Sequence, residues 1–226
     1  MIIRITYNTL VENGAQPPDN FFEIMDKVME ERHKRVLKTM IEETMEDIIW
    51  ETLERCDMNA DAVLVKKILE RIEEAPFCKM RKETPRVIRA LKSMGFKLGV
   101  VSNAPSTFPR KILRRHGLLK YFDAVIISCE VKYRKPAAKI FQIALEKLGL
   151  RPRETIFVGD VKEIDIYGAK KLGMITVLMK YGDPDWKKRA NYLKKILPYN
   201  EDPDFEIENL EELLDIIKQL ISSKKD

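Results

Sequence analysis

The spacing of hydrophobic residues changes along the chain. Residues 1–7 are apolar and rich in β-branched side chains, and they predict a buried strand that ends at the turn-like Asn8. From residue 21 to residue 72, hydrophobic side chains recur at helical spacing, without the alternation of a half-buried strand. Residues 14–83 are therefore predicted to form an all-helical insert.

From residue 85 onward, short apolar runs alternate with amphipathic segments. The runs predict strands at 97–101, 124–127, 155–158 and 175–179, and residues 210–221 predict a last helix at the sheet edge. Strands that alternate with helices form parallel sheets with helices on both faces. We therefore predict an α/β fold, with a Rossmann-like core made of residues 1–13 and 84–226 and a helical cap domain made of residues 14–83.

The composition is that of an ordinary folded protein. Hydrophobic residues make up 45% and aromatic residues 8%, which is enough for a buried core. The 41 Lys and Arg residues are interleaved with 36 Asp and Glu, so the net charge of +5 does not predict nucleic-acid binding. A charged fraction of 34% with only three glutamines is typical of proteins from hot environments.

The cysteine pattern and the length of the apolar runs indicate the cellular compartment in which the protein is expected. The three cysteines contain no C-x-x-C pair, so neither a zinc site nor a disulfide framework is predicted, and a reducing compartment fits better. No apolar run approaches the roughly 20 residues of a membrane span, and the first residues do not resemble a signal peptide. We expect a soluble cytoplasmic protein without a membrane or nucleic-acid partner, and the sequence does not predict its oligomeric state.

Polar side chains follow three of the predicted strands. Ser102 and Asn103 follow the first, where a hydroxyl beside the free N–H groups of a helix start suits a phosphoryl oxygen. Lys135 offers a point charge to an anion, and the carboxylates of Asp160 and Asp165 have a spacing that suits Mg²⁺. Taken singly, each also fits a helix cap or a surface charge. Because open parallel sheets bind ligands at the carboxyl ends of their strands, we expect these residues to form one site.

In order and spacing, these residues resemble the motifs of the haloacid dehalogenase-like superfamily, which includes many phosphatases. Ser102 matches the second motif, Lys135 the third, and Gly159-Asp160 with Asp165 the fourth. The resemblance covers most of the chain, including a helical insert at the position of that family's cap. It implies catalytic roles for Ser102, Lys135 and Asp160, phosphate or anion contacts from Thr9, Ser102, Asn103 and Lys135, and Mg²⁺ ligands from Asp160 and Asp165.

The first motif departs from the family pattern D-x-D-G-T-L. Thr9 and Leu10 set the register, so Ile5 stands where the family has its nucleophilic aspartate. Tyr7 occupies the position at which the dehalogenase branch also has tyrosine. No Asp or Glu occurs in residues 1–10. An isoleucine can neither form an aspartyl intermediate nor coordinate a metal ion.

Three interpretations remain open. The first is a phosphatase-type enzyme that acts on a small phosphorylated molecule through another nucleophile or water; Asp160 and Asp165 favour it, whereas Tyr7 favours a haloacid dehalogenase-type enzyme. The second is an inactive protein that retains an anion pocket for binding or regulation, as Ile5 suggests. The third is an ordinary enzyme with an altered N-terminus. With few carboxylates, Mg²⁺ is expected to bind weakly, and Lys135 is expected to pair with Asp160.

Overall fold

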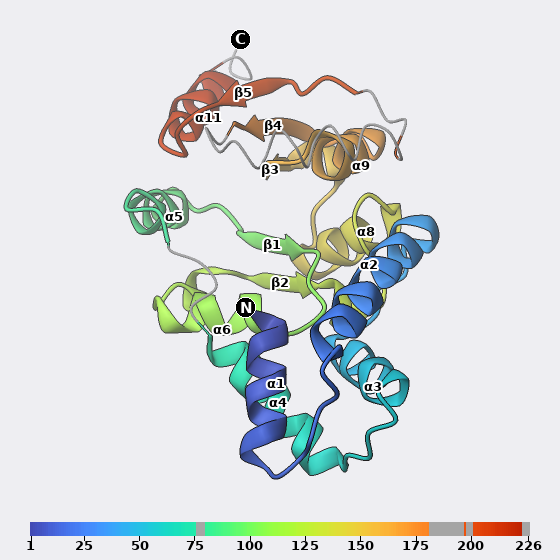
Figure 1. Cartoon of the computed structure of the whole chain (residues 1–226). Helices are drawn as coiled ribbons and strands as arrows, with labels where there is room; N and C mark the ends of the chain where they lie inside the picture. Colours follow the sequence, from blue (N-terminus) through green and yellow to red (C-terminus); the bar gives the residue numbers. More distant parts are fainter. Residues whose placement is uncertain (76–79, 181–196, 198–200, 223–226) are drawn as a thin grey trace. The chain divides into compact units, whose positions relative to one another are not determined.

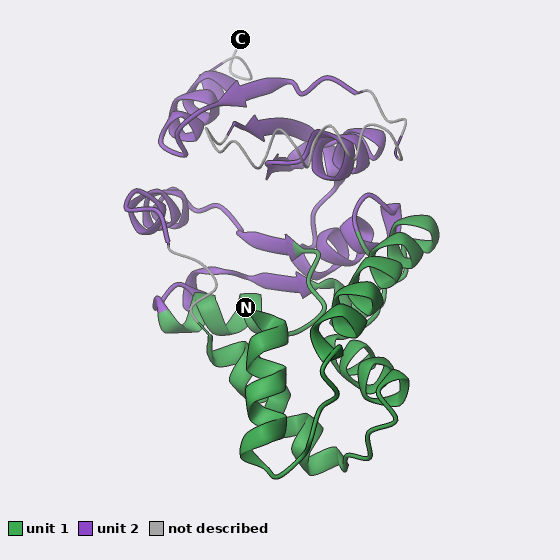
Figure 2. Ribbon diagram, viewed as in Figure 1, with its two compact units in different colours: residues 1–79, 102–115, 127–134 green, residues 80–101, 116–126, 135–226 purple. Residues whose placement is uncertain are grey.

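The computed structural model describes residues 1–75, 80–180, 197 and 201–222. Its contacts divide the chain into two compact units (Figure 2), of which unit 1 contains residues 1–79, 102–115 and 127–134, and unit 2 contains residues 80–101, 116–126 and 135–226. Each unit has its own hydrophobic core. Which segments act as cap and which as core remains the prediction made from the sequence.

Unit 1 is helical, as predicted for the insert (Figure 1). Its longer helices are α1 (Ile2–Glu12), α2 (Phe21–Thr39), α3 (Met45–Arg55) and α4 (Ala62–Glu74), and it also holds α6 (Phe108–Arg115) and the single turn α7 (Ser128–Val131). Helix α3 begins at a capping box between Thr44 and Asp47. Helix α4 begins after Asp61, whose carboxylate accepts the backbone N–H of Leu64 at 2.8 Å.

The strand predicted for residues 1–7 is wrong, because these residues belong to helix α1. Leu10 of this helix is fully buried in the core of unit 1. The hydroxyls of Thr6 and Thr9 donate to the carbonyl oxygens of Ile2 and Ile5, at 3.1 and 2.7 Å, so both threonines satisfy their polar groups inside the helix. Burial of one helical face thus outweighs the β preference of the individual side chains.

Unit 2 holds most of the α/β part of the fold. Strand β1 (Gly99–Ser102) pairs with β2 (Ala124–Ile127), while β3 (Ile156–Gly159), β4 (Ile175–Met179) and β5 (Phe205–Ile207) form a second, parallel sheet with β4 in the middle. The four predicted strands and the α/β class are confirmed, whereas β5 was not predicted. The helical elements are α5 (Thr84–Ser93), η1 (Leu119–Tyr121), α8 (Ala138–Leu148), η2 (Pro152–Glu154), the π-helical turn η3 (Lys162–Ile166), α9 (Tyr167–Lys171) and α11 (Glu212–Ser222).

Helix α11 confirms the predicted C-terminal helix. Its residues Leu213 and Ile217 are buried in one cluster with Val177 and Met179 of β4 and Val87 of α5. The amphipathic pattern of this segment therefore reflects packing against the sheet.

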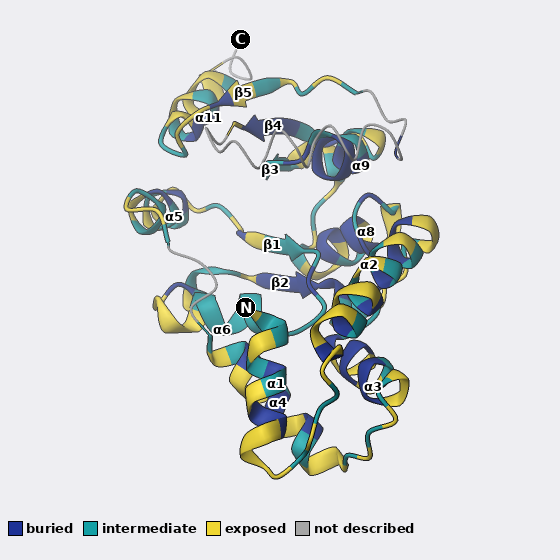
Figure 3. Ribbon diagram, viewed as in Figure 1, coloured by how far each residue is buried: buried dark blue, intermediate teal, exposed yellow. Residues whose placement is uncertain are grey.

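Burial differs among the strands (Figure 3). All of β2 and most of β4 are buried, whereas β1 and β3 are only partly buried. Among the described strands, β1 pairs with β2 alone and β3 with β4 alone, so each keeps one unpaired edge. The carboxyl ends of β1 and β3, which carry predicted site residues, therefore remain partly accessible.

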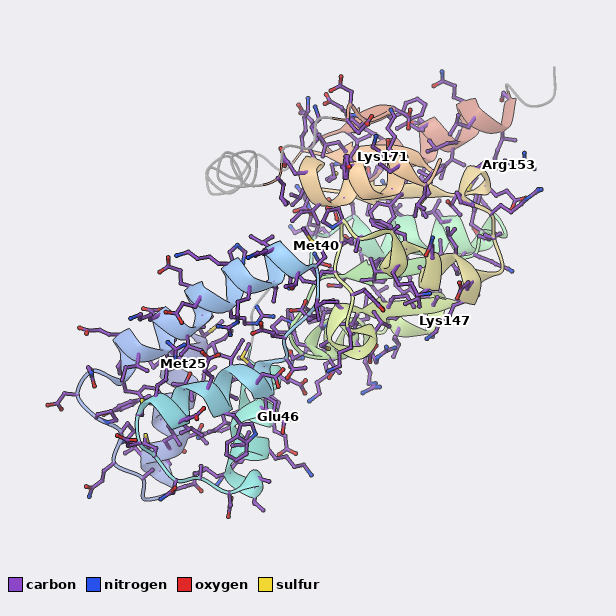
Figure 4. All side chains as sticks on the ribbon, turned by 90° about the vertical axis from the view of Figure 1, so that its right-hand side faces the viewer. Met25, Met40, Glu46, Lys147, Arg153 and Lys171 are labelled. Atoms are coloured by element: carbon purple, nitrogen blue, oxygen red, sulfur yellow. The ribbon has the colours of Figure 1, made fainter. Side chains whose placement is uncertain are left out.

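Many charged side chains lie on the outside of the two units, whereas Arg32, Glu42, Arg134, Glu163 and Asp165 are buried. In Figure 4, Met25 lies among the helices of unit 1, where it is fully buried, whereas Lys147, Arg153 and Lys171 extend from the surface of unit 2. Within the described ranges, no helix combines the length and the apolar character needed to cross a lipid bilayer.

Candidate functional site

Lys135 and Asp165 form an ion pair in unit 2. Lys135 Nζ lies 2.7 Å from Asp165 Oδ1, and the two side chains are only 12% and 4% exposed. The same ammonium group donates to the carbonyl oxygen of Val101 in β1 at 2.9 Å, and it lies 5.6 Å from the ring centroid of Phe157 in β3. The lysine therefore links the end of β1 to the turn after β3. The sequence predicted Asp160 as its partner, but the ion pair is with Asp165.

The two carboxylate oxygens of Asp165 have different surroundings. Oδ2 accepts the backbone N–H groups of Asp160 and Val161 at 3.1 and 3.0 Å, which fixes the turn at the end of β3. Oδ1 is buried and accepts no hydrogen bond of normal geometry, although the Lys135 ammonium group is close. This oxygen therefore keeps capacity for a further ligand.

Two glycines make the close packing at this turn feasible. A Cβ atom on Gly159 would lie 2.3 Å from Cβ of Asp165, so only glycine allows that side chain to approach the strand end. A Cβ on Gly168 would lie 2.5 Å from Cε2 of Phe141 and 2.9 Å from the carbonyl oxygen of Pro136. The glycines of this motif thus hold α9 and the lysine-bearing segment against each other.

Mg²⁺ is the metal ion that the resemblance implies for this site. In the described part of the chain, no group of three or more His, Cys, Asp or Glu side chains is placed to hold a metal ion. If Mg²⁺ binds, Asp160 and Asp165 would be its carboxylate ligands, with water and phosphate oxygens completing the shell, a common arrangement for Mg²⁺. The unsatisfied Oδ1 of Asp165 is consistent with this role.

The remaining predicted residues lie in unit 1. Ser102 ends β1, directly after Val101, and is partly buried together with Asn103. Thr9 is fully buried on α1, where its hydroxyl donates to the Ile5 carbonyl and accepts from Arg71 at 3.1 Å, and its predicted phosphate contact stays a prediction. The contacts of Lys135 with the Val101 carbonyl and the Phe157 ring were not predicted. A backbone carbonyl acceptor and an aromatic residue within a strand leave no recognisable motif in the sequence.

Ile5, at the position of the expected nucleophile, also lies on α1. It is partly buried and lines a hollow of about 470 Å³ with apolar neighbours that include Met1, Ile3 and Phe22. Among the described cysteines, Cys129 is poorly suited to replace the missing aspartate, because burial raises its pKa to about 11, and the nearby charges of Glu130, Glu42 and Glu73 act in the same direction. The neutral thiol is a poor nucleophile.

Comparison with known proteins identifies the family. A family model described as haloacid dehalogenase-like hydrolase matches residues 5–173. The glyceraldehyde 3-phosphate phosphatase of Methanopyrus kandleri is 39% identical over 132 residues, which is 58% of this chain and 53% of that protein. The corresponding protein of Methanocaldococcus jannaschii is 38% identical over 143 residues, or 63% and 57% of the two chains. The chain thus spans about half the length of these curated relatives.

Solved structures agree with this match. A phosphatase of the same family from Thermococcus onnurineus is 26% identical, with a TM-score of 0.60 over 96% of this chain and 87% of that one. A 2-haloacid dehalogenase from Pseudomonas syringae shares the fold, with a TM-score of 0.68 at 21% identity over 97% and 90% of the two chains. With the strand-end motifs and the family match over most of its length, this chain belongs to the haloacid dehalogenase-like hydrolases.

Proposed function

We propose that this protein binds the phosphate group of a small phosphorylated metabolite at Lys135 and acts as a phosphatase-type hydrolase. The observation that carries the proposal is the Lys135–Asp165 pair beside the carboxyl ends of β1 and β3. A lysine held by Asp165 and the Val101 carbonyl presents a fixed point charge to a phosphate. Relatives are named as phosphatases of glyceraldehyde 3-phosphate, ribulose-1,5-bisphosphate and phosphoglycolate, which supports small phosphorylated molecules as the substrate class.

The charges of the site give Mg²⁺ a role. One lysine and the two carboxylates of Asp160 and Asp165 leave a formal charge of −1, which repels a phosphate dianion. A bound Mg²⁺ would neutralise this repulsion and polarise the phosphoryl oxygens. We propose that Mg²⁺ and phosphate bind together and each weakly alone, because linkage makes the coupling between two ligands reciprocal.

Ile5 restricts the reaction that the site can perform. Without an aspartate at this position, no aspartyl intermediate forms there. Hydrolysis then proceeds by direct attack of water on phosphorus: a P–O bond to the water oxygen forms, the ester P–O bond breaks, and the proton that the water loses is balanced by the one that the leaving alkoxide takes up, which gives the alcohol and inorganic phosphate. In this proposal Lys135 holds the phosphate, and Asp160 is required as a catalytic carboxylate.

A second candidate function is binding without turnover, which Ile5 specifically favours. Loss of a catalytic nucleophile costs several orders of magnitude in kcat, and only binding and electrostatic effects are left. A protein of this kind would keep the Lys135 anion site for ligand recognition or regulation.

The experiment is an assay of phosphate release from a panel of small phosphate esters, with Mg²⁺ and at elevated temperature. The Asp160→Asn and Lys135→Met variants are measured in parallel. Phosphate release by the wild type that is lost in both variants supports the phosphatase function. Absence of release, together with phosphate binding that Lys135→Met removes, supports the binding protein. Release or binding that neither substitution alters would contradict both functions.

A further inference from the structure

The hollow in unit 1 contains none of the residues of the proposed anion site. Its volume is about 470 Å³, and its walls come from the first turns of α1, the residue before them, and the start of α2: Met1, Ile3, Arg4, Ile5, Asn8 and Phe22. Sites for small molecules commonly have volumes of about 300–1,000 Å³, mostly apolar walls and a few polar groups. The hollow has the size and the lining of such a site.

The helical repeat of α1 gathers the polar and apolar parts of this lining. Met1 and Ile5 are four positions apart, and so are Arg4 and Asn8, so these side chains are neighbours on one face of the helix. The fully buried Leu10 lies on the other face, in the core of unit 1. The face that lines the hollow is therefore not the face that α1 uses for packing.

The apolar wall of the hollow is held in place by aromatic contacts. The ring centroid of Phe22 lies 5.0 Å from that of Tyr7, which in turn lies 5.7 Å from the fully buried Phe21. Phe22 itself is 40% exposed, and Met1 is 62% exposed. A ligand with an apolar chain would remove these exposed surfaces from water, which is favourable.

The polar groups of the hollow favour an anion with a single charge. Within the described residues, the guanidinium of Arg4 and the side-chain amide of Asn8 make no hydrogen bond or ion pair, and the lining contains no Asp or Glu. A guanidinium can donate two parallel hydrogen bonds to a carboxylate. One arginine neutralises a carboxylate but leaves a phosphate dianion half compensated, so the charge of the hollow matches a monocarboxylate.

We infer that the hollow binds a monocarboxylate with an aliphatic chain of medium length. The carboxylate pairs with Arg4 and accepts from the Asn8 amide, and the chain lies against Ile5 and Phe22. This binding involves no reaction and is independent of the proposed phosphatase function.

The test is calorimetric titration of octanoate, below its micelle concentration, into the full chain. The variants are Arg4→Met, which removes the charge and keeps an apolar stem, and Arg89→Met as the matched control. Arg89 of α5 is also exposed and, in the described part of the chain, also without an ion pair, but it belongs to unit 2 and does not line the hollow. Circular dichroism checks that each variant is folded.

The two parts of the ligand are separated by a second compound, 1-octanol, which has the same chain and no charge. The Kd of octanoate is expected to rise about tenfold in Arg4→Met and to stay unchanged in Arg89→Met, because a hydrogen-bonded charge is lost only in the first variant. The Kd of 1-octanol is expected to exceed that of octanoate in the wild type and to be the same in Arg4→Met.

Methyl NMR locates the bound octanoate. The δ1-methyl resonance of Ile5 is expected to shift on titration, whereas that of Ile217, in the core of unit 2, stays unchanged. Lys135→Met is expected to keep the wild-type octanoate Kd, which separates this hollow from the anion site.

Several results would overturn the inference: no octanoate binding by the folded wild type, an unchanged octanoate Kd in Arg4→Met, or 1-octanol that binds the wild type as tightly as octanoate. An unshifted Ile5 methyl, or loss of octanoate binding in Lys135→Met, would place the ligand elsewhere and overturn it as well. None of these results depends on phosphate release, so the proposed function and this inference stand or fall separately.

Discussion

Within the described residues, one buried charge cluster surrounds Glu42 in unit 1 and another surrounds Lys135 in unit 2. In the first, two arginines and a serine saturate both oxygens of a single carboxylate. In the second, Asp165 Oδ1 has one ammonium group beside it and no hydrogen bond of normal geometry. The two oxygens of Glu42 are thus occupied by donors of the protein, although Arg134 Nε is buried without an acceptor, whereas Asp165 Oδ1 can accept a further donor or a cation.

The difference shows which buried carboxylate can take up a further ligand. A carboxylate whose two oxygens are both occupied cannot accept another ion without losing a contact. An incompletely saturated cluster at a strand end can accept a phosphate or a cation at low cost. The proposed anion site at Lys135 is of the second kind, whereas the Glu42 carboxylate is of the first.

The largest expected effect comes from removing the Glu42 carboxylate. Glu42→Ala leaves two buried guanidinium groups without their carboxylate, and the free energy of unfolding is expected to fall by about 3–5 kcal/mol. Urea denaturation measures this change. Glu30→Ala removes a carboxylate that is 68% exposed and paired with Lys34, and it should leave the free energy of unfolding nearly unchanged. Equal losses in the two variants would contradict the special cost of removing the buried carboxylate of Glu42.

A smaller effect is expected at the turn that carries Asp165. The Cβ of Gly159→Ala collides with Asp165, so overpacking should lower the free energy of unfolding by about 1–3 kcal/mol and weaken phosphate binding. Gly99→Ala is the control, because its Cβ meets only the flexible end of Leu148, at 3.1 Å. Wild-type phosphate affinity in Gly159→Ala would show that the position of Asp165 is not critical.

The smallest effect concerns Cys129, which follows Ser128 in the chain. Its pKa of about 11 means that the thiol stays protonated well above the ordinary value of 9.0. Iodoacetamide should therefore modify Cys129 slowly at pH 8 and faster as the pH approaches 11, as peptide mass spectrometry can follow. Because the folded-state pKa is raised, the stability contribution is present below pH 9 and is lost between pH 9 and about 11. Rapid labelling at pH 8 would argue against this burial.

The sequence predicted the residues around Lys135 better than those around Glu42. Gly159, Asp160 and Asp165 follow a clear apolar strand, and their spacing alone placed them at its carboxyl end. Arg32 and Glu42 carry no such signal, because charged residues are usually exposed and these two meet Ser128 only through the tertiary fold. The pairing of Lys135 with Asp165 rather than Asp160 likewise depends on a backbone turn that spacing does not specify.

The N-terminal segment was predicted wrongly for a related reason. Residues 1–7 are β-branched and resemble a strand, but a short apolar run fits a buried helix equally well. The packing of α1 against α4 decides between the two, and periodicity over seven residues does not contain that information. By contrast, the four strands of residues 99–179 alternate with helices over a long stretch, so their pattern left little ambiguity.

The most direct test of the central claim is calorimetric titration of inorganic phosphate into the wild type and into Lys135→Met, with and without Mg²⁺. The account predicts binding by the wild type that is stronger with Mg²⁺, and loss of that binding in Lys135→Met. Equal affinity in the two proteins, or no binding by the folded wild type under either condition, would contradict the claim that Lys135 and Asp165 form an anion site.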